Sequence, residues 1–161
     1  MAPNTERKLD TAVGRVMEAV GRCLIVYQRI ELCLKYLLPH VVGPNHTPAE
    51  TLAQWRILLN SKTTLGPLME RLRESVRASD PMGFEHYVSE VVAQRNELIH
   101  HFCQLPFGRM NSVEECEAAL AHISRHIEFA LPLYHGLHGM LSQFRDALTE
   151  LKLQKEVGTA P

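Results

Sequence analysis

Three residues of one short segment carry the side chains best suited to chemistry. Arg95, Asn96 and His100 lie within the stretch Gln-Arg-Asn-Glu-Leu-Ile-His-His-Phe, which ends at Phe102. An imidazole can take or give a proton near neutral pH, and a guanidinium can hold a phosphate through two parallel hydrogen bonds. These groups suit metal-independent cleavage of RNA, because the ribose 2′-hydroxyl itself serves as the nucleophile.

Each of the three side chains fits a distinct part in such a reaction. His100 could take the proton from the 2′-hydroxyl or give one to the leaving 5′-oxygen. Arg95 could stabilise the extra charge of the pentacoordinate transition state. Asn96 could orient His100 or hydrogen-bond a phosphate oxygen. The products would carry a 2′,3′-cyclic phosphate and a 5′-hydroxyl.

Arg95 also interrupts an otherwise regular apolar pattern. It stands between Val91 and Leu98 in a series that starts at Phe84 and ends at Phe102, with the spacing of a helix. A charged residue on a core-facing stripe is costly to bury. A local rule broken inside a consistent pattern often marks a functional site.

The positions of these residues on an ideal helix imply that two copies of the chain form the site. Asn96 and His100 lie one turn apart, whereas Arg95 is rotated by about 100° from Asn96 and by about 140° from His100. One protomer therefore cannot easily bring Arg95 and His100 to the same small ligand. Two such helices packed across a twofold axis could do so.

The elements that must position the segment are expected to be helices throughout, with no strand pattern. The first helix should run from about Glu6 to Leu38 and end at Pro39, with a loop at Gly43-Pro44. Later helices should start at capping residues, each followed by a proline or by a capping-box glutamate. These starts are Thr47-Pro48, Asp80-Pro81 and Ser112-Val113, with a further helix from about Leu65 after a polar break at 60–63.

The two helices nearest the C-terminus have predicted bounds of their own. The motif helix should span about 81–104, and the final helix about 113–154, with a kink at Pro132. Residues 155–161 are expected to be disordered, and about 5–154 to be ordered. The two long helices would leave parts of their apolar stripes uncovered unless a second chain packs on them, so we expect a homodimer.

Length and composition are those of one globular domain over residues 1–161. Of these 161 residues, 45% are hydrophobic and 22% are charged, and the net charge is −1. A dedicated DNA reader would usually be more basic. Arg71, Arg73 and Arg77, with Lys62 and Arg56 nearby, could form a local basic face, although a solvated helix face is the favoured interpretation. No apolar run approaches the roughly 20 residues of a membrane span.

The motif Arg95-Asn96-Glu97-Leu98-Ile99-His100 resembles that of the HEPN superfamily, whose commonest form is R-N-x-x-x-H. The early stretch from Tyr27 to Lys35 is also similar to these proteins. The resemblance covers about residues 10–150 in architecture but only about ten residues in detail. It implies an all-α, HEPN-like, up-down helical bundle with two long helices, which dimerises through its motif helices.

The resemblance also implies a function, partners and further site residues. Many HEPN proteins are ribonucleases of toxin–antitoxin, phage-defence or RNA-processing systems, so RNA is the implied substrate and a cognate antitoxin a possible partner. Glu31 is the candidate for the polar residue that faces the motif from an early helix, and His101 is a second candidate site residue. One branch carries a tyrosine modified by a partner nucleotidyltransferase, but Phe102 stands at that position here.

Other interpretations of the same residues remain open. Arg95 could be a structural cation paired with Glu31 or Glu90, and His100 an ordinary histidine. The chain would then be a non-catalytic helical interaction or nucleotide-binding module, as are other relatives.

We expect neither a cofactor nor a metal ion. The pairs His122/His126 and His135/His138 are spaced to share a helix face, but neither has a nearby Asp or Cys in its own segment to complete a set of ligands. The four cysteines form no C-x-x-C pair, and the polar N-terminus shows no signal peptide. We therefore expect reduced thiols and a cytoplasmic location.

Overall fold

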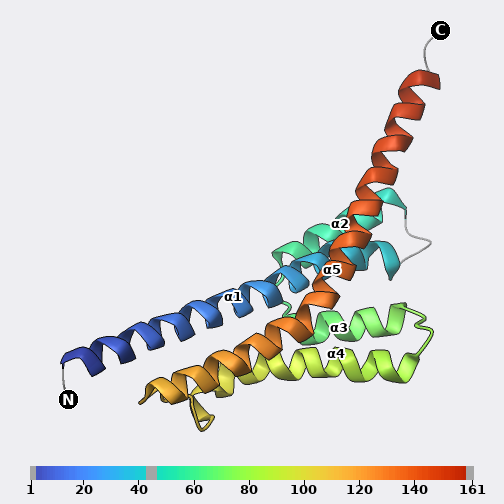
Figure 1. Ribbon diagram of the computed structural model, residues 1–161. Coiled ribbons are helices and arrows are strands. Elements are labelled where there is room, and N and C mark those ends of the chain that lie inside the picture. The colour runs from blue at the N-terminus through green and yellow to red at the C-terminus, as the bar shows by residue number, and fades with distance from the viewer. Residues whose placement is uncertain (1–2, 43–46, 159–161) are drawn as a thin grey trace.

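The computed structural model is built from helices, and it describes residues 3–42 and 47–158. Two long helices, α1 (Pro3–Val41) and α5 (Val113–Gly158), pack against each other along much of their length (Figure 1). α2 (Pro48–Asn60) and α3 (Leu65–Ser75) pack on α1, and α4 (Pro81–Asn96) lies beside α3 and α5. The prediction of an all-α fold is confirmed for the described residues.

The core lies where α1, α3, α4 and α5 meet. α1 buries residues at helical spacing that include Tyr27, Ile30 and Leu34, and α5 does the same with Ile123 and Leu137. Burial of such stripes is the main source of stability for a helical fold, since isolated helices are marginal in water. The fully buried large side chains include Tyr27, Ile30, Leu34, Leu37, Leu38, Leu65, Leu68, Met69, Ile123, Val16 and Val91.

Two of the predicted helix starts have the expected capping contacts, and the third has them in part. Thr47 and Glu50 form a reciprocal capping box, and the carboxylate of Asp80 accepts a hydrogen bond from the backbone N–H of Gly83. Ser112 accepts from the N–H of Glu115, but the Glu115 carboxylate bonds the N–H of Asn111 and not that of Ser112. Each contact satisfies a backbone donor that the first helical turn leaves unpaired.

The first helix extends further than predicted at both ends. Pro39 lies inside α1, which continues to Val41, and the N–H of Val42 still donates to the carbonyl of Leu38 over 2.9 Å. A proline removes only its own backbone donor and fits helical φ, so one more turn can form after it. The predicted loop residues Gly43-Pro44 lie outside the described residues.

The motif segment was predicted to be one regular helix over about 81–104, and this prediction is wrong. α4 ends at Asn96, a π-helical turn η1 (Glu97–His101) follows, and a 3₁₀ turn η2 (Phe102–Gln104) completes the segment. The wider turn places Leu98 and Phe102 in the core while Ile99, His100 and His101 stay exposed. π-turns of this kind occur frequently at functional sites.

Pro132, at which a kink was predicted, lies inside α5, and this helix changes direction along its length (Figure 1). Near this proline the hydroxyl of Tyr87 donates to the carbonyl of Phe129 over 2.9 Å. α5 is helical to Gly158, beyond the predicted end near 154, and residues 159–161 lie outside the described part of the chain. Within the described chain no helix combines the length and apolar character needed to cross a membrane.

Candidate functional site

Arg95 lies at the end of α4, where its guanidinium contacts two other polar residues. Its Nη2 is 3.5 Å from Oε1 of Glu31 on α1, and its Nη1 donates to Oδ1 of Asn96 over 3.2 Å. The side chains of Arg95 and Glu31 are only 16% and 19% exposed, so the ion pair is partly withdrawn from solvent. Of the two carboxylates considered as partners of Arg95, Glu31 is the one in contact, whereas Glu90 accepts from Gln94.

Glu31 has a second contact that is purely structural. The same oxygen, Oε1, accepts a hydrogen bond of 3.0 Å from the backbone N–H of Leu65, the first residue of α3. The N-cap residue Thr64 makes no capping hydrogen bond with its own side chain. Glu31 therefore caps α3 from another helix, and a negative charge there also suits the positive end of the helix dipole.

His100 and His101 lie in η1 with both side chains exposed, and their ring centroids are 6.2 Å apart. Asn96 is exposed as well. Among the described residues no hydrogen bond or ion pair joins His100 to Arg95 or Asn96. The single chain thus brings Arg95 to Asn96 and Glu31 but not to His100.

Phe102 is part of the core and not of an open site. It is 9% exposed, and its ring lies edge-on to that of Phe107, with centroids 6.2 Å apart. Gly108 packs so closely on the backbone of Phe102 and Cys103 that a side chain there would overlap it. The turn after the motif therefore folds back onto η2 and fixes its position.

The predicted basic face is partly neutralised. Arg73 forms ion pairs with both Glu70 and Glu85. Hydrogen bonding and charge from Glu70, with the charge of Glu85, raise the pKa of Arg73, which stays a cation. This pairing agrees with the favoured interpretation of a solvated helix face.

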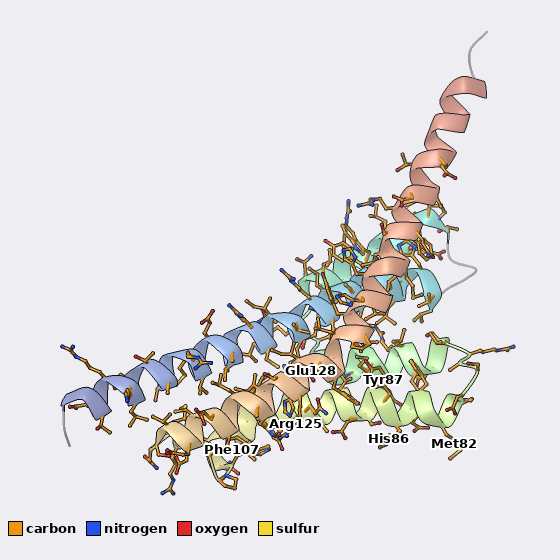
Figure 2. All side chains as sticks on the ribbon, in the orientation of Figure 1. Met82, His86, Tyr87, Phe107, Arg125 and Glu128 are labelled. Carbon is orange, nitrogen blue, oxygen red and sulfur yellow. The ribbon has the colours of Figure 1, made fainter. Side chains whose placement is uncertain are left out.

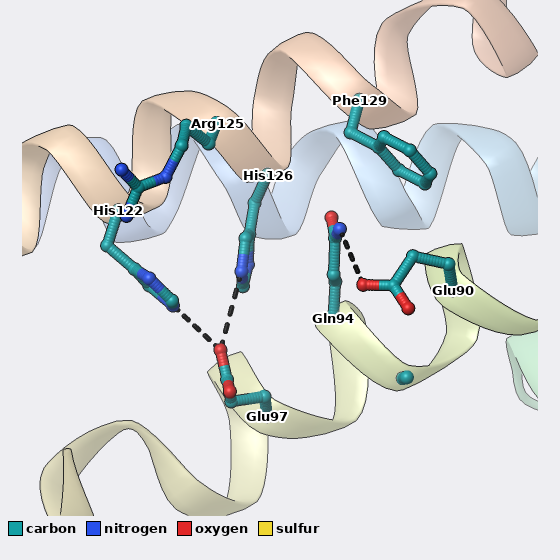
Figure 3. Close-up of a pocket in the computed structure, with 8 residues that line it drawn as sticks. Glu90, Gln94, Glu97, His122, Arg125, His126 and Phe129 are labelled. Carbon is teal, nitrogen blue, oxygen red and sulfur yellow. Dashed lines mark hydrogen bonds and ion pairs between the residues drawn. The ribbon is translucent and has the colours of Figure 1, made fainter. Parts of the chain in front are cut away.

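A second polar cluster lies between the motif segment and α5. Glu97, the first residue of η1, points at two histidines one turn apart on α5 (Figure 3). Nε2 of His122 donates to Oε1 of Glu97 over 2.7 Å, and Nε2 of His126 is 3.4 Å from the same oxygen. The two imidazole centroids are 4.4 Å apart.

This cluster forms part of the wall of a pocket of about 460 Å³ between α4 and α5. Glu90, Gln94, Arg125 and Phe129 complete most of the lining (Figure 3). Two buried polar atoms at this pocket, Oε1 of Gln94 and Nδ1 of His126, have no hydrogen-bond partner. Buried polar groups are nearly always satisfied in proteins, so these two atoms require an explanation.

His126 is the most buried member of the cluster. It is 5% exposed and is the one buried polar side chain among those described. Burial, followed by the neighbouring His122, lowers the pKa of His126, while the carboxylates of Glu97 and Glu90 oppose this effect. His126 is therefore neutral at pH 7.

Glu97 was not predicted as a partner of His122 and His126, because its carboxylate comes from 25 residues away and not from their own segment. One signal in the sequence pointed to His126. The series Ala119, Ile123, His126, Ala130 and Leu133 has helical spacing with one polar member, as Arg95 has in the motif segment.

No family model matches this chain, and neither a curated protein nor a solved structure matches it.

Proposed function

We propose that the chain is a metal-independent endoribonuclease of the HEPN type, with Arg95, Asn96 and His100 acting in a cleft between two copies. The observation that carries the proposal is the R-N-x-x-x-H segment, in which His100 is exposed on an irregular turn. Exposure is needed because a general base must reach the ribose. Glu31 and Asn96 hold the guanidinium of Arg95 in a defined position.

A second copy supplies what a single chain lacks. Arg95 of one protomer would hold the phosphate and stabilise its transition-state charge, while His100 of the other moves the proton. Preorganisation of Arg95 by Glu31 lowers the entropy cost of this arrangement. His101 is exposed beside His100 and would contact the RNA backbone.

RNA is the proposed substrate. The proposed biological role is that of a toxin or a phage-defence effector in the cytoplasm. A cognate antitoxin would be the partner that keeps such an activity in check. Control by a nucleotidyltransferase is disfavoured, since Phe102 lacks a hydroxyl and its ring is buried.

The contacts of Arg95 also favour a second function. A guanidinium tied to a carboxylate that itself caps α3 is a structural arrangement, and ion pairs of this kind also occur without catalysis. The chain would then be a non-catalytic helical module that binds a protein or a nucleotide.

Cleavage of single-stranded RNA by untagged protein in excess EDTA tests the proposal. The wild type should cleave, and Arg95→Ala and His100→Ala should each be slower by about 100-fold or more, the usual size of a general acid–base contribution. His86→Ala is the matched control, because His86 is an exposed histidine of α4 away from the motif (Figure 2).

The chemistry of the RNA ends identifies the mechanism. Mass spectrometry should find 2′,3′-cyclic phosphate and 5′-hydroxyl ends. Equal cleavage by the wild type and both motif variants would indicate a contaminating nuclease and refute the proposal. A folded wild type without activity in EDTA would support the non-catalytic module.

A further inference from the structure

We propose that Glu97, His122 and His126 bind one divalent transition-metal ion, with Zn²⁺ as the best match. The three side chains come from η1 and α5 and converge on one point (Figure 3). Within the described part of the chain, no other three His, Cys, Asp or Glu side chains offer donor atoms this close together. Nothing in this inference depends on the ribonuclease activity.

The distances between the donor atoms fit a tetrahedral ion. Bonds of about 2.0–2.1 Å to imidazole nitrogen and carboxylate oxygen put neighbouring donors about 3.3 Å apart around Zn²⁺. Nε2 of His126 is 3.4 Å from Oε1 of Glu97, and all the donor atoms lie within 4.8 Å of one another. The distance from Nε2 of His122 to the same oxygen, 2.7 Å, would have to grow to about 3.3 Å around the ion.

The arrangement of the ligands favours zinc over magnesium or calcium. Two histidines at i and i+4 on one helix, joined by a glutamate from another element, give the His₂Glu set that leaves a fourth position for water. Magnesium and calcium instead prefer oxygen ligands. The open position would face the pocket between α4 and α5.

The charge of the pocket also favours a cation. Glu90 and Glu97 contribute two negative charges to the lining of the pocket, against one positive charge from Arg125. An anion such as phosphate would meet two carboxylates there. A dication would instead be attracted to both.

The two unpaired buried atoms suit a metal-bound state. When Nε2 of a histidine binds a metal, its Nδ1 carries the proton and seeks an acceptor. Nδ1 of His126 and Oε1 of Gln94 are both buried without partners at this pocket. In the metal-bound state they would be a donor and an acceptor, the complementary groups that a bridging water joins.

Titration of untagged, EDTA-treated protein with Zn²⁺, and separately with Co²⁺, tests the site. One equivalent should bind, and bound Co²⁺ should show the intense visible absorption of a tetrahedral ion. Glu97→Gln and His122→Ala should each lower the affinity by about tenfold or more. Both positions are partly exposed, so these variants should fold.

His138→Ala is the matched control, since His135 and His138 form the other paired histidines of α5 and are exposed. It should bind like the wild type. The melting temperature of the wild type should rise by about 8 °C at a hundredfold excess of Zn²⁺ over Kd, and that of Glu97→Gln by much less. No binding at about 100 micromolar Zn²⁺ would mean a binding free energy weaker than roughly 5 kcal/mol and would overturn the inference. Equal binding by the wild type and Glu97→Gln would overturn it as well.

Discussion

A single carboxylate oxygen, that of Glu31, contacts two different helices. It accepts from the first N–H of α3 and lies beside the guanidinium of Arg95 on α4. The motif arginine is thus held by the same residue that fixes where α3 begins. The position of Arg95 therefore depends on how α1, α3 and α4 meet. Substitution of Glu31 should change stability through the cap of α3, whereas substitution of Arg95 should change the proposed chemistry.

Two substitutions of Glu31 should differ in their effect on stability. Glu31→Ala removes the cap and the ion pair and should lower the free energy of unfolding by about 2 kcal/mol. Glu31→Gln keeps an oxygen that can accept from Leu65 and should lower it by less than about 1 kcal/mol. Urea denaturation measures both, and equal losses would contradict the capping role.

The buried thiol of Cys23 should make the fold sensitive to alkali. Burial raises the pKa of Cys23 from 9.0 to about 11, so its thiol ionises in the unfolded chain before it does so in the folded one. Stability is therefore full below pH 9 and falls as the pH rises towards 11, by on the order of 2 kcal/mol. Burial also raises the pKa of the neighbouring Tyr27, which acts in the same direction.

Urea denaturation in reducing buffer between pH 8 and 11 measures this effect. Cys23→Ala should flatten the fall in the free energy of unfolding with pH. Cys103→Ala, which changes an exposed cysteine, should leave it as in the wild type. Parallel curves for Cys23→Ala and wild type would show that other groups cause the loss.

At the scale of the elements, the motif segment is fixed at both ends. Asp80 caps the start of α4, and the turn that contains Gly108 packs against the backbone of η2 at the other end. Between them Glu97 contacts α5 while Leu98 and Phe102 are buried. The π-turn therefore lies in a segment whose two ends are fixed by these contacts and one face of which packs on the rest of the fold. His100 and His101 lie on the opposite, exposed face at a defined position.

The capping contact of α4 should contribute measurably to stability. Asp80→Ala leaves the N–H of Gly83 without its partner and should cost about 1 kcal/mol, whereas Asp80→Ser keeps an acceptor and should cost less. Gly83→Ala should gain less than the roughly 1 kcal/mol that alanine usually adds within a helix, because its Cβ would displace the Asp80 carboxylate. Thermal denaturation of the three variants checks the order, and a neutral Asp80→Ala would argue against the cap.

At the scale of the whole molecule, the proposed activity needs a dimer that places the exposed face of η1 at its centre. Ile99, adjacent to His100, is 41% exposed and is the apolar residue of that face. The C-terminal half of α5 also exposes apolar residues, among them Phe144 and Leu148. These two surfaces imply different dimers, and only the first joins Arg95 to the His100 of a second copy.

A pair of charge substitutions separates these two dimers. Ile99→Glu should weaken self-association by about 2 kcal/mol and abolish RNA cleavage, since a charge would be buried at the centre of the interface. Leu148→Glu should leave both unchanged. Sedimentation equilibrium measures the association, and a monomer in the wild type, or a dimer lost only in Leu148→Glu, would contradict the proposed arrangement.

Local chemistry along the sequence determined the helices of this protein. Apolar residues at helical spacing, together with Thr47, Asp80 and Ser112 at helix starts, set the elements because a helix satisfies its backbone within itself. The bounds were less accurate where a proline or a π-turn changes only a few hydrogen bonds, as at Pro39 and Glu97. The proposal for Arg95, Asn96 and His100 rests on their types and spacing in the sequence.

The contacts between helices were decided only by the tertiary structure. The approach of Glu31 to Leu65, 34 positions away, and that of Glu97 to His122, 25 positions away, depend on how the helices cross. The burial of His126 depends on the same packing. Sequence spacing gives the direction of a side chain about its own helix axis, but not which side chain of another helix it meets.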